Sequence, residues 1–350
     1  MVSLKETLRF LQPVTRELVH RSSVSEVFVT DGLYTGGAEF VVAAQWPRDH
    51  ALYHPDENGL YDPLLFAETL RQAHFYAAHT FFGVPLGHRF VGQDLSFEIT
   101  DPTALRVGAA PLAVLLDGTW EWQGGTPARR AGARMDVSLV VDGRVCGRGH
   151  ARGLIVDERR YGLLRRRAAE AAGVGEAPVG HGPATVADTG LVPPHRVGRQ
   201  RRKDCVLERV ATGAPDRQWR LRSDQDHAIL FDHPTDHVPL MVMLEGFRQL
   251  GHLTVHESAQ GAAAGEEFVL SGLVLDCAAF GELSAPVHLT VVEDAPDPLR
   301  DGGRRLRFEA EQGGKRLAVA ETLWWNVGRC DPGPLECLTE APPLSAAASR

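Results

Sequence analysis

Residues 231–250 read Phe-Asp-His-Pro-Thr-Asp-His-Val-Pro-Leu-Met-Val-Met-Leu-Glu-Gly-Phe-Arg-Gln-Leu. Pro239 suits the first turn of a helix, because its missing N–H would have no intrahelical acceptor there. The residues after it are apolar on almost every side, which predicts a helix buried against a sheet. Glu245 and Arg248 lie three residues apart on one face of this helix. A buried charge is costly unless it is paired, so this conflict is the first indication of a functional site.

The chain contains this helical pattern twice. The two copies of the spacing Glu-x-x-Arg-Gln stand 177 residues apart and consist of Glu68, Arg71, Gln72 and of Glu245, Arg248, Gln249. A constant offset of about half the 350-residue chain indicates an internal duplication. A chain of this length also exceeds the usual size of one hydrophobic core, so we expect two similar modules.

Each module has the expected elements of an α+β fold, in which a curled antiparallel sheet wraps a long central helix. After a short helical lead-in over residues 1–20, the first module is expected to contain strands at 24–30 and 40–46, a helix from Asp62-Pro63 to about residue 82, strands at 90–100 and 113–123, and a hairpin over 135–156 turning at Asp142-Gly143. The second is expected to contain strands at 205–210 and 219–222, the helix after Pro239, strands at 268–280 and 286–293, and a hairpin over 305–327 turning at Gly313-Gly314.

The composition places the module boundaries and suggests one interaction surface. We expect modules at 1–164 and 203–328, a linker with basic ends at 165–202, and a frayed tail at 329–350. The basic ends are Arg165-Arg166-Arg167 and the run 199–203. A solvated connector is the favoured interpretation of this linker. The alternative is a docking patch for an acidic partner such as an acyl carrier protein.

Composition also excludes several classes of protein. No apolar run approaches the roughly 18 residues of a membrane span, and the N-terminus lacks the apolar segment of a signal peptide, which favours a cytoplasmic protein. The five cysteines have no Cys-x-x-Cys spacing, which argues against a structural zinc site. A net charge of −8 disfavours binding to nucleic acid. We expect no cofactor and no metal.

The helical spacing places a carboxylate, a guanidinium and an amide of each copy on one face, where they can line a pocket. Glu245 and Arg248 can equally serve only to pair with each other and hold the helix in its sheet. The loop before the second helix adds His233 and His237, each beside an acid, and such a histidine can act as a general base near neutral pH. A purely structural role in the loop is equally open. A metal site is disfavoured, because a Pro-containing loop lacks the helical frame of a His-x-x-x-His site.

The run from His233 to Gln249, with its degenerate twin ending at Gln72, resembles the AfsA-type A-factor biosynthesis family of γ-butyrolactone synthases. The resemblance implies a tandem (double) hotdog fold. It also implies an acyltransferase that condenses a β-ketoacyl thioester on acyl carrier protein with dihydroxyacetone phosphate, giving a precursor of a butenolide, γ-butyrolactone or furan signalling molecule. A homodimer is compatible with the resemblance. One departure is Leu240, where relatives are expected to carry glycine.

This reaction suggests roles for the residues above. The backbone N–H groups around Leu240 and Met241 are expected to bind the thioester oxygen. Glu245, Glu68, His233 and His237 are the candidate bases, and burial is expected to raise the pKa of Glu245 toward that task. Arg248 or Arg71, beside Gln249 and Gln72, would bind the phosphate, and an apolar tunnel would hold the acyl chain.

Two other classes of function remain open from the sequence. A hotdog thioesterase or dehydratase would use the same Glu and His residues without a phosphate-binding arginine. A non-catalytic acyl-binding regulatory protein would keep the pocket and lose the polar residues. The duplicated Glu-x-x-Arg-Gln motif favours an enzyme over the binding protein.

Overall fold

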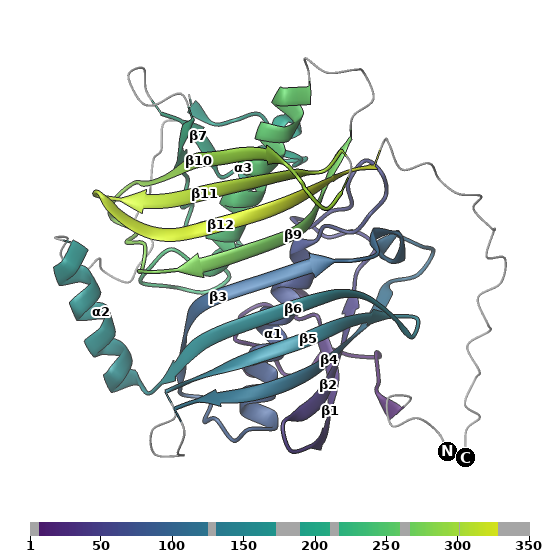
Figure 1. Ribbon diagram of the computed structural model, residues 1–350. Helices are drawn as coiled ribbons and strands as arrows, with labels where there is room; N and C mark the ends of the chain where they lie inside the picture. The colour runs from purple at the N-terminus through teal and green to yellow at the C-terminus, as the bar shows by residue number, and fades with distance from the viewer. Residues whose placement is uncertain are drawn as a thin grey trace.

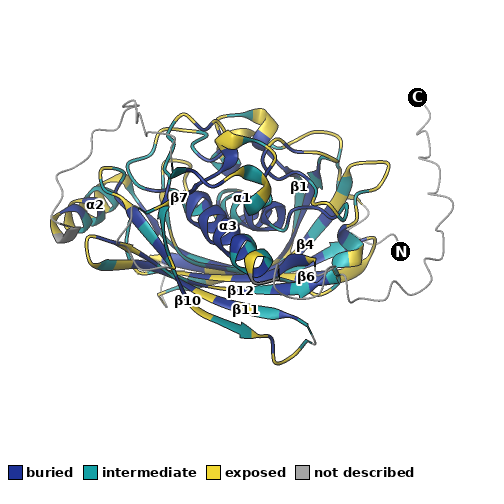
Figure 2. Cartoon of the chain, turned by 90° about the horizontal axis from the view of Figure 1, so that it is seen from above, coloured by how far each residue is buried: buried dark blue, intermediate teal, exposed yellow. Residues whose placement is uncertain are grey.

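The computed structural model describes residues 7–124, 131–172, 190–210, 217–259, 267–300 and 302–327. One twelve-stranded antiparallel sheet curls around two long helices, α1 and α3, which lie side by side in its trough (Figures 1 and 2). The long helices are α1 (Leu64–Thr80), α2 (Glu158–Ala172) and α3 (Leu240–Ala259). The strands are β1 (Val29–Gly36), β2 (Glu39–Trp46), β3 (Arg89–Ile99), β4 (Leu112–Gln123), β5 (Gly132–Val141), β6 (Arg144–Val156), β7 (Leu207–Arg209), β8 (Gln218–Leu221), β9 (Phe268–Cys277), β10 (Val287–Pro296), β11 (Arg304–Gln312) and β12 (Lys315–Asn326).

The strand order shows the duplication directly. It runs β1-β2-β4-β5-β6-β3 through the first module and then β9-β12-β11-β10-β8-β7 through the second, which is the mirrored order of equivalent strands. The two modules meet where β3 pairs with β9, with Leu95 opposite Leu275. Both modules therefore belong to one chain and share one sheet, which confirms the expected α+β architecture of two curled sheets around two helices.

Local sequence explains the ends of several elements. An Asp62 side-chain oxygen accepts the N–H of Leu64 at 2.8 Å, so this aspartate caps α1 as the sequence predicts. The two hairpin turns were also predicted correctly. Asp142 and Gly143 have φ of 48° and 76°, and Gly313 and Gly314 have φ of 58° and 78°, the left-handed values that two-residue hairpin turns require.

The duplication extends to two buried histidines that fix the loops before the helices. Nδ1 of His50 accepts the N–H groups of the residues two and three positions later, at 3.2 and 3.1 Å. His227, 177 residues further on, makes the same pair of bonds at 3.3 and 3.1 Å. Their Nε2 atoms lie 3.3 Å from Glu26 and 3.1 Å from Asp204, respectively. Each loop is thus anchored at the same place relative to its helix.

Three sequence expectations were wrong in detail. Residues 24–26 form a 3₁₀ turn, η3 (Val24–Glu26), and β1 begins only at Val29. The described part of the lead-in contains a 3₁₀ turn, η2 (Arg16–Val19), in place of a longer helix. The expected linker begins inside α2, because Arg165 lies in the middle of that helix. The predicted tail lies outside the described residues. Among the described helices, none is both long and apolar enough to cross a bilayer.

Candidate active site

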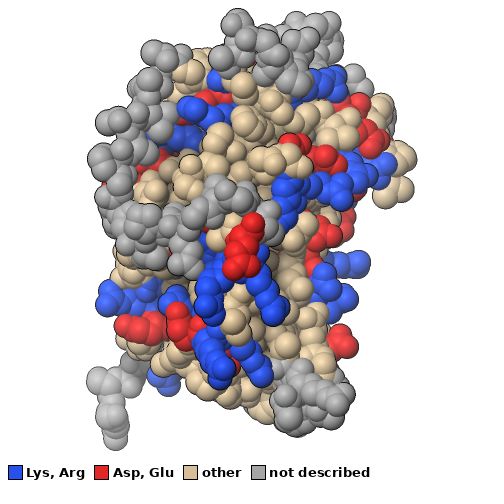
Figure 3. Space-filling model, turned by 90° about the vertical axis from the view of Figure 1, so that its left-hand side faces the viewer, with Lys and Arg blue, Asp and Glu red and all other residues tan. Residues whose placement is uncertain are grey.

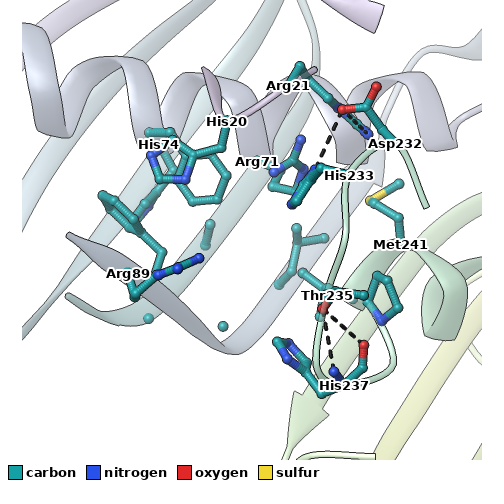
Figure 4. A pocket seen from close by; sticks show the side chains of 18 of the residues that line it. His20, Arg21, Arg71, His74, Arg89, Asp232, His233, Thr235, His237 and Met241 are labelled. Carbon is teal, nitrogen blue, oxygen red and sulfur yellow. Dashed lines mark hydrogen bonds and ion pairs between the residues drawn. The ribbon is translucent and has the colours of Figure 1, made fainter. Parts of the chain in front are cut away.

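Two cavities occupy equivalent places in the two halves of the molecule. In the first, of about 360 Å³, the loop before α3 faces α1; we call it the His237 cavity (Figure 4). In the second, of about 400 Å³, the loop before α1 faces α3, and we call it the His252 cavity. Each cavity combines the loop of one module with the helix of the other, so neither module forms a site alone.

Glu245, the first candidate base, is fully buried and fully paired. Its two carboxylate oxygens accept bonds from Arg199 at 2.7 and 2.5 Å, and Arg248 and Gln249 add bonds at 3.2 and 2.5 Å. Burial alone raises the pKa of Glu245, but the charges of Arg199 and Arg248 outweigh it and hold the pKa at about 2. The expectation that burial raises this pKa toward that of a general base is therefore wrong.

Glu68 repeats this arrangement in the first module. It is fully buried, pairs with Arg21 at 2.7 Å and Arg71 at 2.9 Å, and these charges outweigh burial to hold its pKa at about 2. Neither Glu68 nor Glu245 lines the His237 cavity or the His252 cavity. Both carboxylates therefore position the helices, and their geometry gives no support to the catalytic roles predicted for them.

The two glutamines also hold the backbone in place. Gln249 donates to the carbonyl oxygen of Asp204 at 2.7 Å and accepts the N–H of Val206 at 2.9 Å. Gln72 makes the equivalent bonds to Glu26 and Phe28, at 2.7 and 2.8 Å. The structure thus brings each predicted trio together in a buried network, and within each trio only the arginine lines a cavity.

The loop before α3 supplies an aspartate–histidine dyad to the His237 cavity. Nδ1 of His237 lies 2.7 Å from Asp236, and α2 holds the same carboxylate through the Tyr161 hydroxyl at 2.7 Å and Arg165 at 3.0 Å. Burial raises the pKa of Asp236, but the bonds from His237 and Tyr161 and the charge of Arg165 bring it well below its usual range. An ionised Asp236 favours the tautomer with hydrogen on Nδ1, which leaves Nε2 of His237 to accept a proton.

His233 is held less tightly than His237. Its Nδ1 lies 3.5 Å from Asp232, and its side chain is 48% exposed, against 28% for His237. Asp232 fixes the start of the loop, because it accepts the N–H groups of Ser22 and Ser23 at 2.6 and 3.1 Å. Of the two histidines, His237 is therefore the more firmly positioned and His233 the more exposed.

Four arginines of the first module line the same cavity: Arg21, Arg71, Arg89 and Arg152. Arg21 is the buried partner of Glu68, so the other three are the candidates for binding an anion. Figure 4 shows Arg89 across the cavity from the loop that carries His237, and it draws Arg71 beside His233. Arg89 pairs with Glu158 at 2.8 Å at the surface, where such a pair exchanges readily for another anion. Arg71 was predicted from the sequence. Arg89 was not, because a single arginine at the start of a strand carries no recognisable pattern.

The sequence analysis also missed how two arginines of the expected linker are used. Arg199 is buried, and it bridges Glu245 and Asp62, the latter at 2.6 Å. Arg165 is buried as well, and it joins Asp236 to Glu282 at 2.8 Å. These two residues correct the interpretation of the basic ends as a solvated connector, since each end contributes one arginine to the interior.

His20 is a further residue of the cavity that the sequence did not reveal. It has left-handed backbone angles, φ 52° and ψ 52°, at the end of η2. The equivalent residue at the end of η7 (Pro194–Val197) is Gly198, with φ 59° and ψ 42°. Nε2 of His20 lies 2.9 Å from Nε2 of His79. Nδ1 of His79 in turn lies 2.8 Å from the carbonyl oxygen of Val84. Burial lowers the pKa of His20 to about 3, so this ring is a neutral hydrogen-bonding group.

A glycine at position 20 tests whether the histidine is kept for function. A non-glycine residue in this backbone conformation costs roughly 1 kcal/mol, and the twin already carries glycine here. We expect His20→Gly to change the free energy of unfolding by less than about 1 kcal/mol while kcat/KM falls at least tenfold. Denaturant unfolding and steady-state rates measure the two quantities. Normal turnover in this variant would make His20 a packing residue.

The N-terminus of α3 completes the His237 cavity. Within the described residues, the backbone N–H groups of Leu240 and Met241 have no hydrogen-bond acceptor, as the geometry of a first helical turn requires. The Leu240 side chain packs near Gly92 and borders both the His237 cavity and a neighbouring apolar cavity of about 320 Å³. The apolar cavity is lined by Leu154, Leu164, Met243, Phe280 and Leu317, among others.

The two equivalent cavities have different chemistry. The residues 177 positions before Asp236 and His237 are Gly59 and Leu60, so the dyad is absent from the equivalent positions of the His252 cavity. Among the described residues, no group of three or more His, Cys, Asp or Glu side chains is arranged to hold a metal ion. The dyad and the arginines therefore mark the His237 cavity as the candidate active site.

These features define a tandem hotdog protein with a polar site between its two modules. The chain belongs to the A-factor biosynthesis hotdog domain family, whose model matches residues 2–157 and 184–328. It is 36% identical over 300 residues to the 2-oxo-3-(phosphooxy)propyl 3-oxoalkanoate synthase of Streptomyces virginiae, covering 85% of this chain and 93% of the relative. The synthase of the same name from Streptomyces griseus is 33% identical over 242 residues, covering 68% and 74%. An acyl-ACP thioesterase from Bacteroides thetaiotaomicron is 12% identical, with a TM-score of 0.45 over 81% of this chain and 98% of that one.

Proposed function

We propose that the protein transfers a β-ketoacyl group from acyl carrier protein to the hydroxyl group of dihydroxyacetone phosphate in the His237 cavity. The observation that carries this proposal is the geometry of that cavity, which a histidine–aspartate dyad lines together with four arginines. A base and a phosphate-binding surface are the two groups that a phosphorylated alcohol needs when it attacks a thioester. The relatives are named for a 2-oxo-3-(phosphooxy)propyl 3-oxoalkanoate, which is the ester that such a reaction forms.

His237 acts as the general base in this reaction. Its Nε2 takes the proton from the triose hydroxyl as the oxygen attacks the thioester carbonyl carbon. Asp236 holds the ring through Nδ1 at 2.7 Å and stabilises the imidazolium that forms. Arg71, Arg89 and His233 bind the phosphate and so place the hydroxyl near His237.

The N-terminus of α3 binds the negative charge that develops on the thioester oxygen. The N–H groups of Leu240 and Met241 are preorganised donors, and the helix dipole adds to their effect. When the tetrahedral intermediate collapses, the C–S bond breaks and the thiolate takes the proton from His237. The products are the carrier thiol and a phosphorylated β-keto ester. This ester can then close to a butenolide, the precursor of a γ-butyrolactone or furan signal, when the carbon between its two acyl carbonyls adds to the triose ketone and water is lost.

The apolar cavity accommodates the acyl chain. It adjoins the His237 cavity at His237 and Leu240, so a thioester carbonyl at the boundary would place its chain on the apolar side and the acceptor on the arginine side. Leu240 stands at this boundary, where relatives were expected to carry glycine. We propose that its larger side chain narrows the passage and selects among acyl chains.

A hotdog thioesterase is the main alternative, because the same dyad can activate water. The arginines of the cavity, Arg71 and Arg89 among them, favour a phosphorylated acceptor over water. The proposed site lies between the two modules of the chain, and the homodimer stays a prediction. We further propose that the reaction takes place in the cytoplasm.

Mass spectrometry of the products tests the proposed function. The purified protein is incubated with a β-ketoacyl carrier-protein thioester, with and without dihydroxyacetone phosphate. We expect a phosphorylated keto ester, or the butenolide derived from it, only when the triose phosphate is present. Free β-keto acid formed at the same rate in both samples would establish a thioesterase, and an unchanged thioester would favour a binding protein.

A further inference from the structure

The helix α2 has two faces with different partners. Its inward face contacts the candidate site, because Tyr161 and Arg165 bind Asp236 and because Leu164 borders the apolar cavity. Its outward face is exposed to solvent and carries Arg159, Arg160, Leu163, Arg166, Arg167 and Glu170. One helix thus connects a surface patch to the aspartate of the dyad.

The outward face is strongly basic in a protein of net charge −8. Arg160 lies 3.6 Å from Asp157, whereas Arg159, Arg166 and Arg167 have no acidic side chain within ion-pair distance in the part of the chain that the structure describes. Figure 3, which views the molecule from the side on which α2 lies in Figure 1, shows Lys and Arg side chains gathered near the middle of this face. We call Arg159, Leu163, Arg166 and Arg167 the α2 patch.

The fold does not require the arginine charges on the outward face of α2. Exposed arginines spaced along one helix repel each other unless an anionic surface covers them. The exposed side chain of Leu163, at 40%, adds an apolar contact in their midst. Arginines around a small apolar centre are the composition of a protein interface that recognises an acidic partner.

The place of the patch fits a partner that delivers a substrate. Tyr161 and Glu158 of α2 line the His237 cavity, and Leu164 and Ala168 line the apolar cavity. Because the patch and both cavities share this helix, a partner bound to the outward face stands beside the site where a thioester would react. A partner docked elsewhere on the sheet would have to reach past the helix.

We infer that the α2 patch is the docking surface for the acidic acyl carrier protein that supplies the β-ketoacyl thioester. The inference rests on the proposed function for the identity of the partner. The carrier protein places an acidic surface on the arginines, which sets its acyl-bearing arm beside the two cavities that α2 lines. Binding is expected to weaken with ionic strength, since the contacts are exposed charges.

Charge reversal tests this docking surface. The triple variant Arg159→Glu/Arg166→Glu/Arg167→Glu is compared with a matched control, Arg148→Glu/Arg305→Glu/Arg307→Glu, which makes the same change in charge on exposed residues of β6 and β11. Each protein is assayed with the β-ketoacyl carrier protein and with the same acyl group on pantetheine, which has no protein surface. Carrier-protein binding is also measured directly by calorimetry at low and high salt.

We expect the triple variant to raise the KM for the carrier-protein substrate at least tenfold and to leave kcat/KM for the pantetheine substrate within twofold. The control variant should match the unmodified protein in both assays. An equal loss with both substrates, or an equal loss in the control, would overturn the docking surface. If the unmodified protein turned over neither substrate, the proposed function would fail. The calorimetric comparison would still decide the docking surface, because it needs no turnover.

Discussion

We expect His237→Gln to lower kcat roughly 10²- to 10⁴-fold without changing the fold, because the variant keeps a polar side chain but loses the general base. The effect should be the largest of any single change in the cavity. Asp236 would then hold an amide in place of an imidazole, so the loop anchored by Tyr161 and Arg165 should persist. Single-turnover formation of the ester measures the chemical step apart from product release.

Two further variants make the His237 result specific. His195→Gln makes the same substitution at an exposed histidine of the His252 cavity. It should leave the rate of ester formation unchanged. His233→Gln should mainly raise the KM for dihydroxyacetone phosphate, since this histidine is assigned to the phosphate. If His233→Gln instead abolished ester formation and His237→Gln did not, the roles of the two histidines would have to be exchanged.

The fold could be predicted from the sequence because its signals are local and repeated. The 177-residue offset, the helix start at Asp62-Pro63 and the turns at Asp142-Gly143 and Gly313-Gly314 each depend on a few neighbouring residues. The pairing of β3 with β9, which joins the modules into one sheet, could not be predicted this way. It joins strands far apart in the chain, and nothing in either sequence specifies its partner.

The site was predicted only where the sequence motif is itself part of the cavity. His233, His237, Arg71, Leu240 and Met241 all line the His237 cavity, as expected of site residues. Their catalytic roles stay proposals. The motif spacing did place each Glu-x-x-Arg-Gln trio on one helical face, but spacing cannot tell whether that face meets a cavity or a buried arginine.

The partners of the buried glutamates come from segments distant in the sequence. Arg199 reaches Glu245 from a segment that composition marks as a linker, and Arg21 reaches Glu68 from the lead-in. A search for charges near each glutamate in sequence finds only the arginine three residues later. From the sequence, Glu245 was therefore expected to lack sufficient positive charge around it and to have a raised pKa. In the structure, two arginines contact each of the two glutamates and lower the pKa of each to about 2.

The twin cavities show how duplication allowed the two halves to diverge. The structural network of Glu, Gln and two arginines is retained in both, because both helices must be held in the same sheet. The dyad, by contrast, occurs in one loop, and His20 replaces the glycine of its twin at the same cavity. Differences between equivalent positions thus point to function more directly than the shared motif does.

Glu245→Gln should destabilise the protein by about 3 to 5 kcal/mol, because it removes the buried charge that neutralises Arg248 and leaves Arg199 with Asp62 alone. The folded fraction should keep a kcat within a few-fold of normal, which a general base could not do. Denaturant unfolding gives the stability, and titration of active sites gives the rate per folded molecule. Glu68→Gln is the matched variant in the twin network, and the same loss of stability is expected from it. A stable but inactive Glu245→Gln protein would contradict this prediction and show that Glu245 takes part in the reaction.

The same two glutamates set the expected response to acid. Their pKa of about 2 in the folded protein lies below the ordinary value of 4.5, so the stability that they contribute is complete above about pH 4.5 and is lost as the pH falls toward 2. Glu245→Gln should therefore lose stability at pH 7 but show a weaker dependence on pH over this interval than the unmodified protein. An unchanged slope would mean that other carboxylates, and not this pair, control acid unfolding. Because the dyad does not depend on Glu245 for a proton, the rate per folded molecule should be affected much less than the stability.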